Sequence, residues 1–99
     1  MTNRQIIVAF INKNAGGTGP LRSEGDVLRS YEYRLAEWVG LGVHINTGPS
    51  GRFMKRASGN EFDAAYSATT NTHRRLIYSA CNAHGIPVVQ ENFNAGESN

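Results

Sequence analysis

Two long glycine-rich segments interrupt this 99-residue chain and confine its helices and strands to the short stretches between them. The first segment covers residues 12–23 and the second covers residues 46–60. Glycine and proline recur in both, and these residues favour turns over regular structure. Loops this long are uncommon in compact domains unless they have a function. We therefore expect a small α/β scaffold that carries its binding groups on these two loops.

The composition is that of one small globular domain. Hydrophobic residues make up 39% of the chain and charged residues 18%, which argues against a wholly disordered protein. We expect a single domain over residues 1–91 and a flexible polar tail over residues 92–99. Residues 1–4 lack the apolar core of a secretion signal, and no apolar run is long enough to span a membrane. The single cysteine, Cys81, excludes an intramolecular disulfide, so the expected location is the cytoplasm, with no membrane partner.

The first half of the chain divides into an expected strand and an expected helix. Residues 5–11 are apolar and rich in β-branched side chains, which predicts a strand that needs cover on both faces. Residues 24–39 are expected to form a helix that begins after Ser23 and ends at Gly40. The apolar residues at helical spacing in this segment are Leu28, Tyr31, Leu35, Trp38 and Val39.

The second half continues with strands and one further helix. Alternation over residues 41–46 predicts a strand with one solvent-facing side. Residues 61–68 are ambiguous, and we expect a strand there, although their alanine content also permits a helix. Thr70 or Asn71 would cap the second helix, which would end at Gly85. The apolar stripe of that helix consists of Leu76, Ile77, Ala80, Cys81 and His84.

With a last strand over residues 86–90, the expected order of elements is β-α-β-β-α-β. This is the split arrangement of ferredoxin-like α+β sandwiches, with both helices on one side of the sheet. The alternative is a small three-layer α/β sheet, which the doubly apolar first strand favours because central parallel strands are buried on both faces. In the split arrangement the same apolar strand predicts a homodimer.

The second glycine-rich loop carries the strongest candidate binding site. Its run Gly51–Arg56 places three cations within five residues, and Arg74 and Arg75 add two more near the start of the expected second helix. Arg and Lys side chains bind phosphate, and an exposed phenylalanine offers a face on which a base can stack. The predicted ligand is nucleic acid or a nucleotide, and the residues expected to bind it are Arg52, Phe53, Lys55, Arg56, Arg74 and Arg75.

The first glycine-rich loop is a second candidate for binding an anion. It lies between an expected strand and an expected helix, where backbone N–H groups and the helix dipole favour negative charge. Lys13 and Arg22 would supply positive charge to this site. Arg22 stands where the dinucleotide fingerprint has its third glycine, and the Gly-Lys-Ser/Thr of a P-loop is missing. A flexible connector without a ligand is therefore the alternative.

The sequence contains no cofactor motif, and neither a metal site nor a catalytic centre is expected. The clustered soft metal ligands are too few for a zinc site: His73, Cys81 and His84. Cys81 lies on the expected buried stripe, where thiols are unreactive. An enzyme that used Arg52, Lys55 and His44 on a phosphorylated substrate would lack an evident general base.

A small non-enzymatic binding module that engages phosphate is therefore the leading hypothesis. The alternative is a protein-interaction or inhibitor module with a protein target, such as a phage or mobile-element accessory protein that blocks a host macromolecule. That alternative rests on the small size of the chain and on the lack of catalytic motifs. The two hypotheses differ in salt dependence, because nucleic acid releases condensed counterions when cations bind it.

Overall fold

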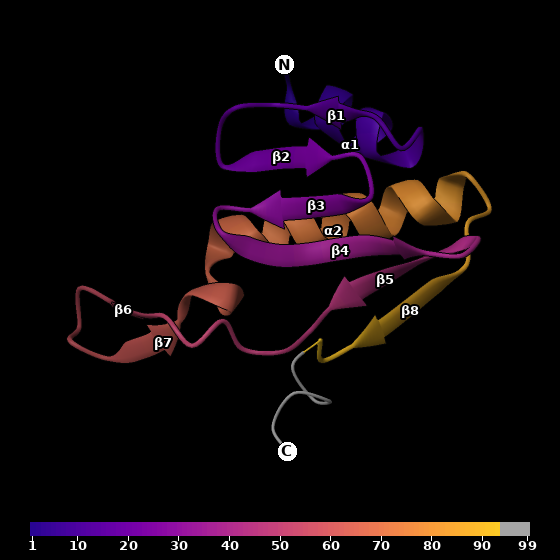
Figure 1. The fold of residues 1–99 in the computed structure, drawn as a ribbon. Coiled ribbons are helices and arrows are strands. Elements are labelled where there is room, and N and C mark those ends of the chain that lie inside the picture. Colours follow the sequence, from indigo (N-terminus) through magenta and orange to yellow (C-terminus); the bar gives the residue numbers. More distant parts are fainter. Residues whose placement is uncertain (94–99) are drawn as a thin grey trace.

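The structure is a computed structural model that describes residues 1–93, and it contains one six-stranded mixed sheet with two helices behind it (Figure 1). Strands β1 to β5 form an antiparallel meander, and β8 pairs parallel to β5. The strands are β1 (Ala15–Gly16), β2 (Leu21–Glu24), β3 (Val27–Ser30), β4 (Tyr33–Val39), β5 (Gly42–Asn46) and β8 (Val88–Glu91). The domain is α+β, as expected, but its elements do not follow the split β-α-β-β-α-β order.

The segment expected to be the first strand is instead helix α1 (Asn3–Ile11). Thr2 caps it, because the Thr2 hydroxyl accepts from the Gln5 N–H while the Gln5 side chain accepts from the Thr2 N–H. This reciprocal capping box satisfies donors that a helix start leaves unpaired. Ile6, Ile7 and Phe10 are buried on one side of the helix, and Val8 is 44% exposed. The apolar run therefore needs cover on one side only, and the argument for a homodimer loses its premise.

The segment expected to be the first helix is instead the meander of β2, β3 and β4. Gly25 turns the chain between β2 and β3 with φ at 100°, and Tyr31 turns it between β3 and β4 with φ at 56°. Leu28 and Leu35 are fully buried, but on two neighbouring strands rather than on one helical face. A spacing of seven residues fits two turns of a helix and also fits inward positions on both sides of a tight turn.

Helix α2 (Ala68–Ala83) returns the chain from β5 to β8, which is why these two strands are parallel. Ser67 caps it through a hydrogen bond to the Thr70 N–H, so the helix begins earlier than Thr70 or Asn71. Only the start of the ambiguous segment is a strand, since β7 (Glu61–Asp63) is followed by a 3-10 turn, η1 (Ala64–Tyr66). The buried side chains of α2 are Thr70, His73, Ile77 and Cys81, while Leu76 and His84 of the expected stripe are exposed.

The last part of the chain follows the sequence-based expectation more closely. β5 and β8 occupy the segments expected to be strands, and Pro87 directly precedes β8. The alternation over residues 41–46 places His44 and Asn46 on the expected solvent-facing side of the strand, but Asn46 is buried. Of the expected tail, residues 92–93 are described, and the Phe93 N–H donates to Asn46 Oδ1 at 3.2 Å. The rest of the expected tail lies outside the described residues.

The two faces of the sheet differ in character. α1 and α2 pack against each other behind the sheet, and the core between them and the strands contains Phe10, Leu21, Leu28, Val43, Ile45, Ile77 and Cys81. Within residues 1–93 no helix lies over the opposite face (Figure 1), so the three-layer alternative is not what the chain forms. Arginines in register on neighbouring strands each pair with a glutamate: Arg22 with Glu32, Arg29 with Glu24 and Arg34 with Glu37.

The second glycine-rich loop contains a strand that pairs outside the main sheet. β6 (Phe53–Lys55) and β7 form an antiparallel hairpin that stands out from the body of the domain (Figure 1). Its tip, residues 56–60, is closed by hydrogen bonds from the Arg56 N–H to the Asn60 carbonyl and from the Gly59 N–H to the Arg56 carbonyl. Neither helix in the described part of the chain has the length and hydropathy to cross a membrane.

Candidate nucleic-acid interface

The carboxylate of Asp63 fixes the base of the β6–β7 hairpin. It accepts hydrogen bonds from the Ser50 hydroxyl at 2.6 Å and from the N–H groups of Ser50, Gly51 and Ala65 at 2.9, 3.0 and 2.8 Å. Burial raises the pKa of Asp63, but these four hydrogen bonds outweigh it and lower the pKa to about 2. These bonds hold the backbone of Ser50 and Gly51 in place, and this fixes the positions of Arg52 and Phe53, which follow directly in the chain.

Arg74, one of the expected ligand-binding residues, instead forms hydrogen bonds that connect several elements of the fold. Its guanidinium donates to the carbonyl oxygens of Asn46 and Ala65 at 3.1 and 3.0 Å, and to Asn71 Oδ1 at 2.6 Å. The same group lies 5.9 Å from the ring centroid of Tyr33 and donates to its hydroxyl at 3.5 Å. Arg74 thus links α2 to the end of β5 and to η1, and its donors already have partners within the protein.

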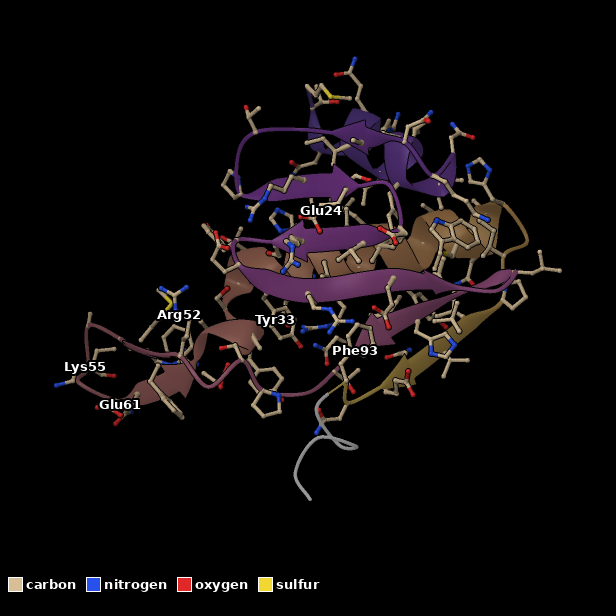
Figure 2. The ribbon with its side chains drawn as sticks, viewed as in Figure 1. Glu24, Tyr33, Arg52, Lys55, Glu61 and Phe93 are labelled. Atoms are coloured by element: carbon tan, nitrogen blue, oxygen red, sulfur yellow. The ribbon has the colours of Figure 1, made fainter. Side chains whose placement is uncertain are left out.

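A cleft of about 560 Å³ lies between the base of the hairpin, the β3–β4 turn and the first turn of α2. This volume falls within the range of roughly 300–1,000 Å³ that is usual for small-molecule pockets. Figure 2 shows Arg52, Tyr33 and Phe93 along the margin between sheet and hairpin, whereas Lys55 and Glu61 lie farther out on the hairpin. The side chains that line the cleft include Arg29, Tyr31, Tyr33, Arg34, Arg52, Phe53, Met54, Thr69 and Phe93.

The three arginines of the cleft differ in how far their charge is already neutralised. Arg29 donates to Glu24 Oε1 at 3.1 Å and to the Glu32 carbonyl at 3.3 Å. Arg34 pairs with Glu37, and its guanidinium lies 5.5 Å from the ring centroid of Phe93. Arg52 has no carboxylate within ion-pairing distance among residues 1–93, and its side chain is exposed. Arg52 therefore contributes the most available positive charge to the cleft.

A second, more open concavity lies on the other side of α2's first turn. It is lined by Lys55 and Arg56 of the hairpin and by Arg75 of α2. Arg56 lies over the ring of Phe62 at 4.6 Å, and all three cations are exposed. The first turn of α2 contains no acidic residue, so the partial positive charge of the helix start is not neutralised by its own side chains. Cleft and concavity together place cations on both sides of one helix terminus.

Lys13 and Arg22 do not form the anion site expected at the first glycine-rich loop. The loop leads into β2 rather than into a helix, so it has no helix dipole to offer. Lys13 lies over the ring of Trp38 at 4.8 Å, near the end of β4 opposite to Tyr33. Arg22 pairs with Glu32 at 3.2 Å on the open face of the sheet. The structure does not bring these two cations together with Arg52, Lys55, Arg56 and Arg75.

Several cleft residues were missed by the sequence-based prediction, notably Tyr31, Arg29, Arg34 and Phe93. The sequence-based prediction placed Tyr31 on the apolar stripe of a helix and Arg29 and Arg34 on the rest of its surface, although Arg29 and Arg34 face each other across β3 and β4. Gly25 was the available signal, because a glycine inside the supposed helix weakens that assignment. Phe93 had no such local signal, since the pairing of β8 with β5 places it beside Asn46.

A chain of buried hydroxyl groups leads from the start of α2 to a histidine. Ser67 donates to Thr70 Oγ1 at 3.1 Å, Thr70 Oγ1 lies 3.1 Å from Ser30 Oγ, and Ser30 Oγ lies 2.7 Å from His73 Nδ1. Burial lowers the pKa of His73 and favours its neutral form. Ser30 is fully buried and His73 nearly so. These hydrogen bonds therefore join β3 to the start of α2.

The remaining candidates for chemistry are also enclosed or dispersed. Cys81 is fully buried, and burial raises the pKa of its thiol to about 11, so the nucleophilic thiolate is disfavoured. Across residues 1–93 no three side chains of His, Cys, Asp or Glu gather closely enough to hold a metal ion. Comparison of the chain with family models, with curated proteins and with solved structures gave no match. The function therefore has to be inferred from the geometry of the site.

Proposed function

We propose that this protein is a non-enzymatic module that binds a phosphate-bearing ligand, nucleic acid or nucleotide, through the β6–β7 hairpin and the N-terminal half of α2. The observation that carries the proposal is that Arg52, Lys55 and Arg75, which lie on the hairpin and on α2 beside it, are exposed and have no carboxylate partner within residues 1–93. Such cations gain from a phosphate without first giving up an ion pair.

The distribution of charge supports this location over the open face of the sheet. Residues 50–75 contain five of the ten Lys and Arg but two of the eight Asp and Glu. One of those two acids is Asp63, whose oxygens already accept hydrogen bonds from the hairpin base. On the open face, by contrast, each of the three arginines has a glutamate partner. A polyanion is therefore attracted to the hairpin and not to the sheet.

The aromatic groups next to these cations favour nucleic acid among phosphate-bearing ligands. Phe53 is 68% exposed and directly follows Arg52 in the chain. A base stacks on such a ring while its phosphates meet the neighbouring cations. Inorganic phosphate would make no use of the ring.

Direct binding of a labelled single-stranded oligonucleotide at low ionic strength, followed by fluorescence anisotropy, tests the proposal. Replacing Arg52, Lys55 and Arg75 together with alanine should weaken binding on the order of tenfold or more, because the phosphate contacts supply most non-specific affinity. Arg75→Ala alone has a matched control in Arg4→Ala, since both arginines are exposed on a helix and have no carboxylate partner within the described residues. Equal effects of these two single substitutions, or no binding by the parent protein, would contradict the proposal and leave the protein-target alternative.

A further inference from the structure

The cleft beside the hairpin has walls suited to a flat aromatic ligand. Phe53 and Tyr31 enter it from opposite elements, the hairpin and the β3–β4 turn, and both rings are strongly exposed, at 68% and 49%. Phe93 and Tyr33 form part of its lining and are half-buried. The Tyr33 hydroxyl donates to the carbonyl oxygens of Gly48 at 2.5 Å and Asn46 at 3.3 Å, so this ring is held in place. The cleft thus combines two accessible rings with a fixed aromatic wall.

The polar groups of the cleft are better suited to binding the phosphates of a nucleic acid than to distinguishing its bases by hydrogen bonds. Asn46, the amide in the cleft, is buried and already engaged: its Nδ2 donates to the Arg34 carbonyl, and its Oδ1 accepts from the Gly48 and Phe93 N–H groups. Hydroxyl groups such as Thr69 can both donate and accept, so they do not distinguish one base edge from another. Arg52, which also lines the cleft and has no carboxylate partner within residues 1–93, remains available for a phosphate.

The cations outside the cleft indicate that the ligand carries more than one phosphate. Lys55, Arg56 and Arg75 line the neighbouring concavity and not the cleft itself. A free nucleotide in the cleft leaves them without phosphate partners. A strand whose base enters the cleft continues past the hairpin and supplies further phosphates to them. In a duplex both faces of each base are covered by neighbouring bases, so the rings of the cleft gain nothing from it.

From this arrangement we infer that the cleft receives one unstacked nucleobase of a single strand, while the adjoining cations bind the phosphates that follow. The inference rests on the proposed function and specifies its ligand as single-stranded nucleic acid. It expects little preference among the four bases, because the recognition uses ring faces and charge.

An abasic competitor separates the base-binding cleft from general phosphate binding. A labelled single strand is compared with a strand of equal length that lacks all of its bases, with the corresponding duplex, and with a mononucleotide as competitor. The abasic strand should bind more weakly by about 5- to 150-fold, the range for loss of one base–aromatic stack. The duplex should bind more weakly than the single strand, and the mononucleotide should compete poorly with it.

A substitution in the cleft locates the base. Phe53→Ala should weaken binding of the normal strand by a similar factor and leave binding of the abasic strand unchanged, because the ring then has no base to stack on. Tyr78→Ala is the matched control, since Tyr78 is exposed on α2 but does not line the cleft. Phe53 is exposed, so its loss should not change the thermal unfolding midpoint.

The possible failures of the two proposals are distinguishable. Equal binding of normal and abasic strands overturns the base-binding cleft while the phosphate-binding function stands. Duplex binding as tight as single-strand binding, or full competition by a mononucleotide, overturns the single-strand assignment. Absence of binding to every strand at low ionic strength ends both proposals.

Discussion

At the scale of single residues, Asp63 has the greatest influence on the proposed site without facing the ligand. Four hydrogen-bond donors at the hairpin base converge on its carboxylate. The donors belong to Ser50 and Gly51, which precede β6, and to Ala65, which lies between β7 and α2. One side chain therefore fixes both the segment that leads into the hairpin and the segment that leads out of it. A carboxylate offers two acceptor oxygens to these four bonds, whereas a neutral amide offers one.

Replacing Asp63 with asparagine should lower the free energy of unfolding by about 1–3 kcal/mol, the cost of leaving buried donors without an acceptor. Urea denaturation measures this effect, and Asp26→Asn is the matched control because Asp26 is exposed. An unchanged urea midpoint for Asp63→Asn would show that the carboxylate does not hold the hairpin base.

The same carboxylate predicts a pH dependence of stability with a definite sign. The pKa of Asp63 in the folded protein is about 2, below its ordinary value of 3.8. Its stabilising effect is therefore complete above pH 3.8 and is lost as the pH falls towards 2. Acid unfolding of the parent protein should include this loss, and Asp63→Asn should lack it.

Part of the candidate site could be predicted residue by residue from the sequence. Arg52, Phe53, Lys55 and Arg56 are neighbours in the chain, so their joint exposure on one hairpin followed a local signal. Arg74 was grouped with them by proximity in sequence, but its donors are used inside the protein. Whether a cation is available for a ligand or is hydrogen-bonded within the protein depends on contacts between distant segments, and no local sequence pattern reveals those contacts.

At the scale of elements, the sequence-based prediction exchanged helix and strand over the first 39 residues. The apolar patterns of these segments fit both kinds of element. Ile6, Ile7 and Phe10 belong to an unbroken apolar run, which fits a strand buried on two faces as well as a helix buried on one. Leu28 and Leu35 fit a helical stripe and also two inward-facing strand positions. Tertiary packing decided both cases, as it often does against local propensity. The later elements were predicted better because Pro87 and Gly85 mark their ends clearly.

The capping box at the start of α1 is the local signal that favours a helix over a strand for Asn3–Ile11. Thr2→Ala removes the hydroxyl that accepts from the Gln5 N–H and should cost about 0.5–2 kcal/mol of stability. The helical signal in circular dichroism and the urea midpoint measure the change. Thr18→Ala, which removes an exposed threonine from a turn, is the matched control. If Thr2→Ala unfolds at the same urea concentration as the parent, the capping box does not stabilise this segment.

At the scale of the whole molecule, the domain separates a nearly neutral body from a basic extension. The open face of the sheet carries paired arginines and glutamates, and the two helices close the opposite face. The hairpin stands outside both layers and carries its cations unpaired within the described residues (Figures 1 and 2). The domain therefore presents a short, positively charged hairpin with a cleft at its base.

The salt dependence of binding to a single-stranded oligonucleotide tests this central claim most directly. The logarithm of the affinity should fall linearly with the logarithm of the salt concentration, and Arg52→Ala, Lys55→Ala and Arg75→Ala should each reduce the magnitude of the slope by roughly 0.7. Phe53→Ala should weaken binding and leave the slope nearly unchanged, because stacking releases no counterions. Arg4→Ala should change neither quantity. A flat salt titration, or a slope that Arg4→Ala reduces as much as the hairpin substitutions do, would contradict the assignment of phosphate binding to this surface.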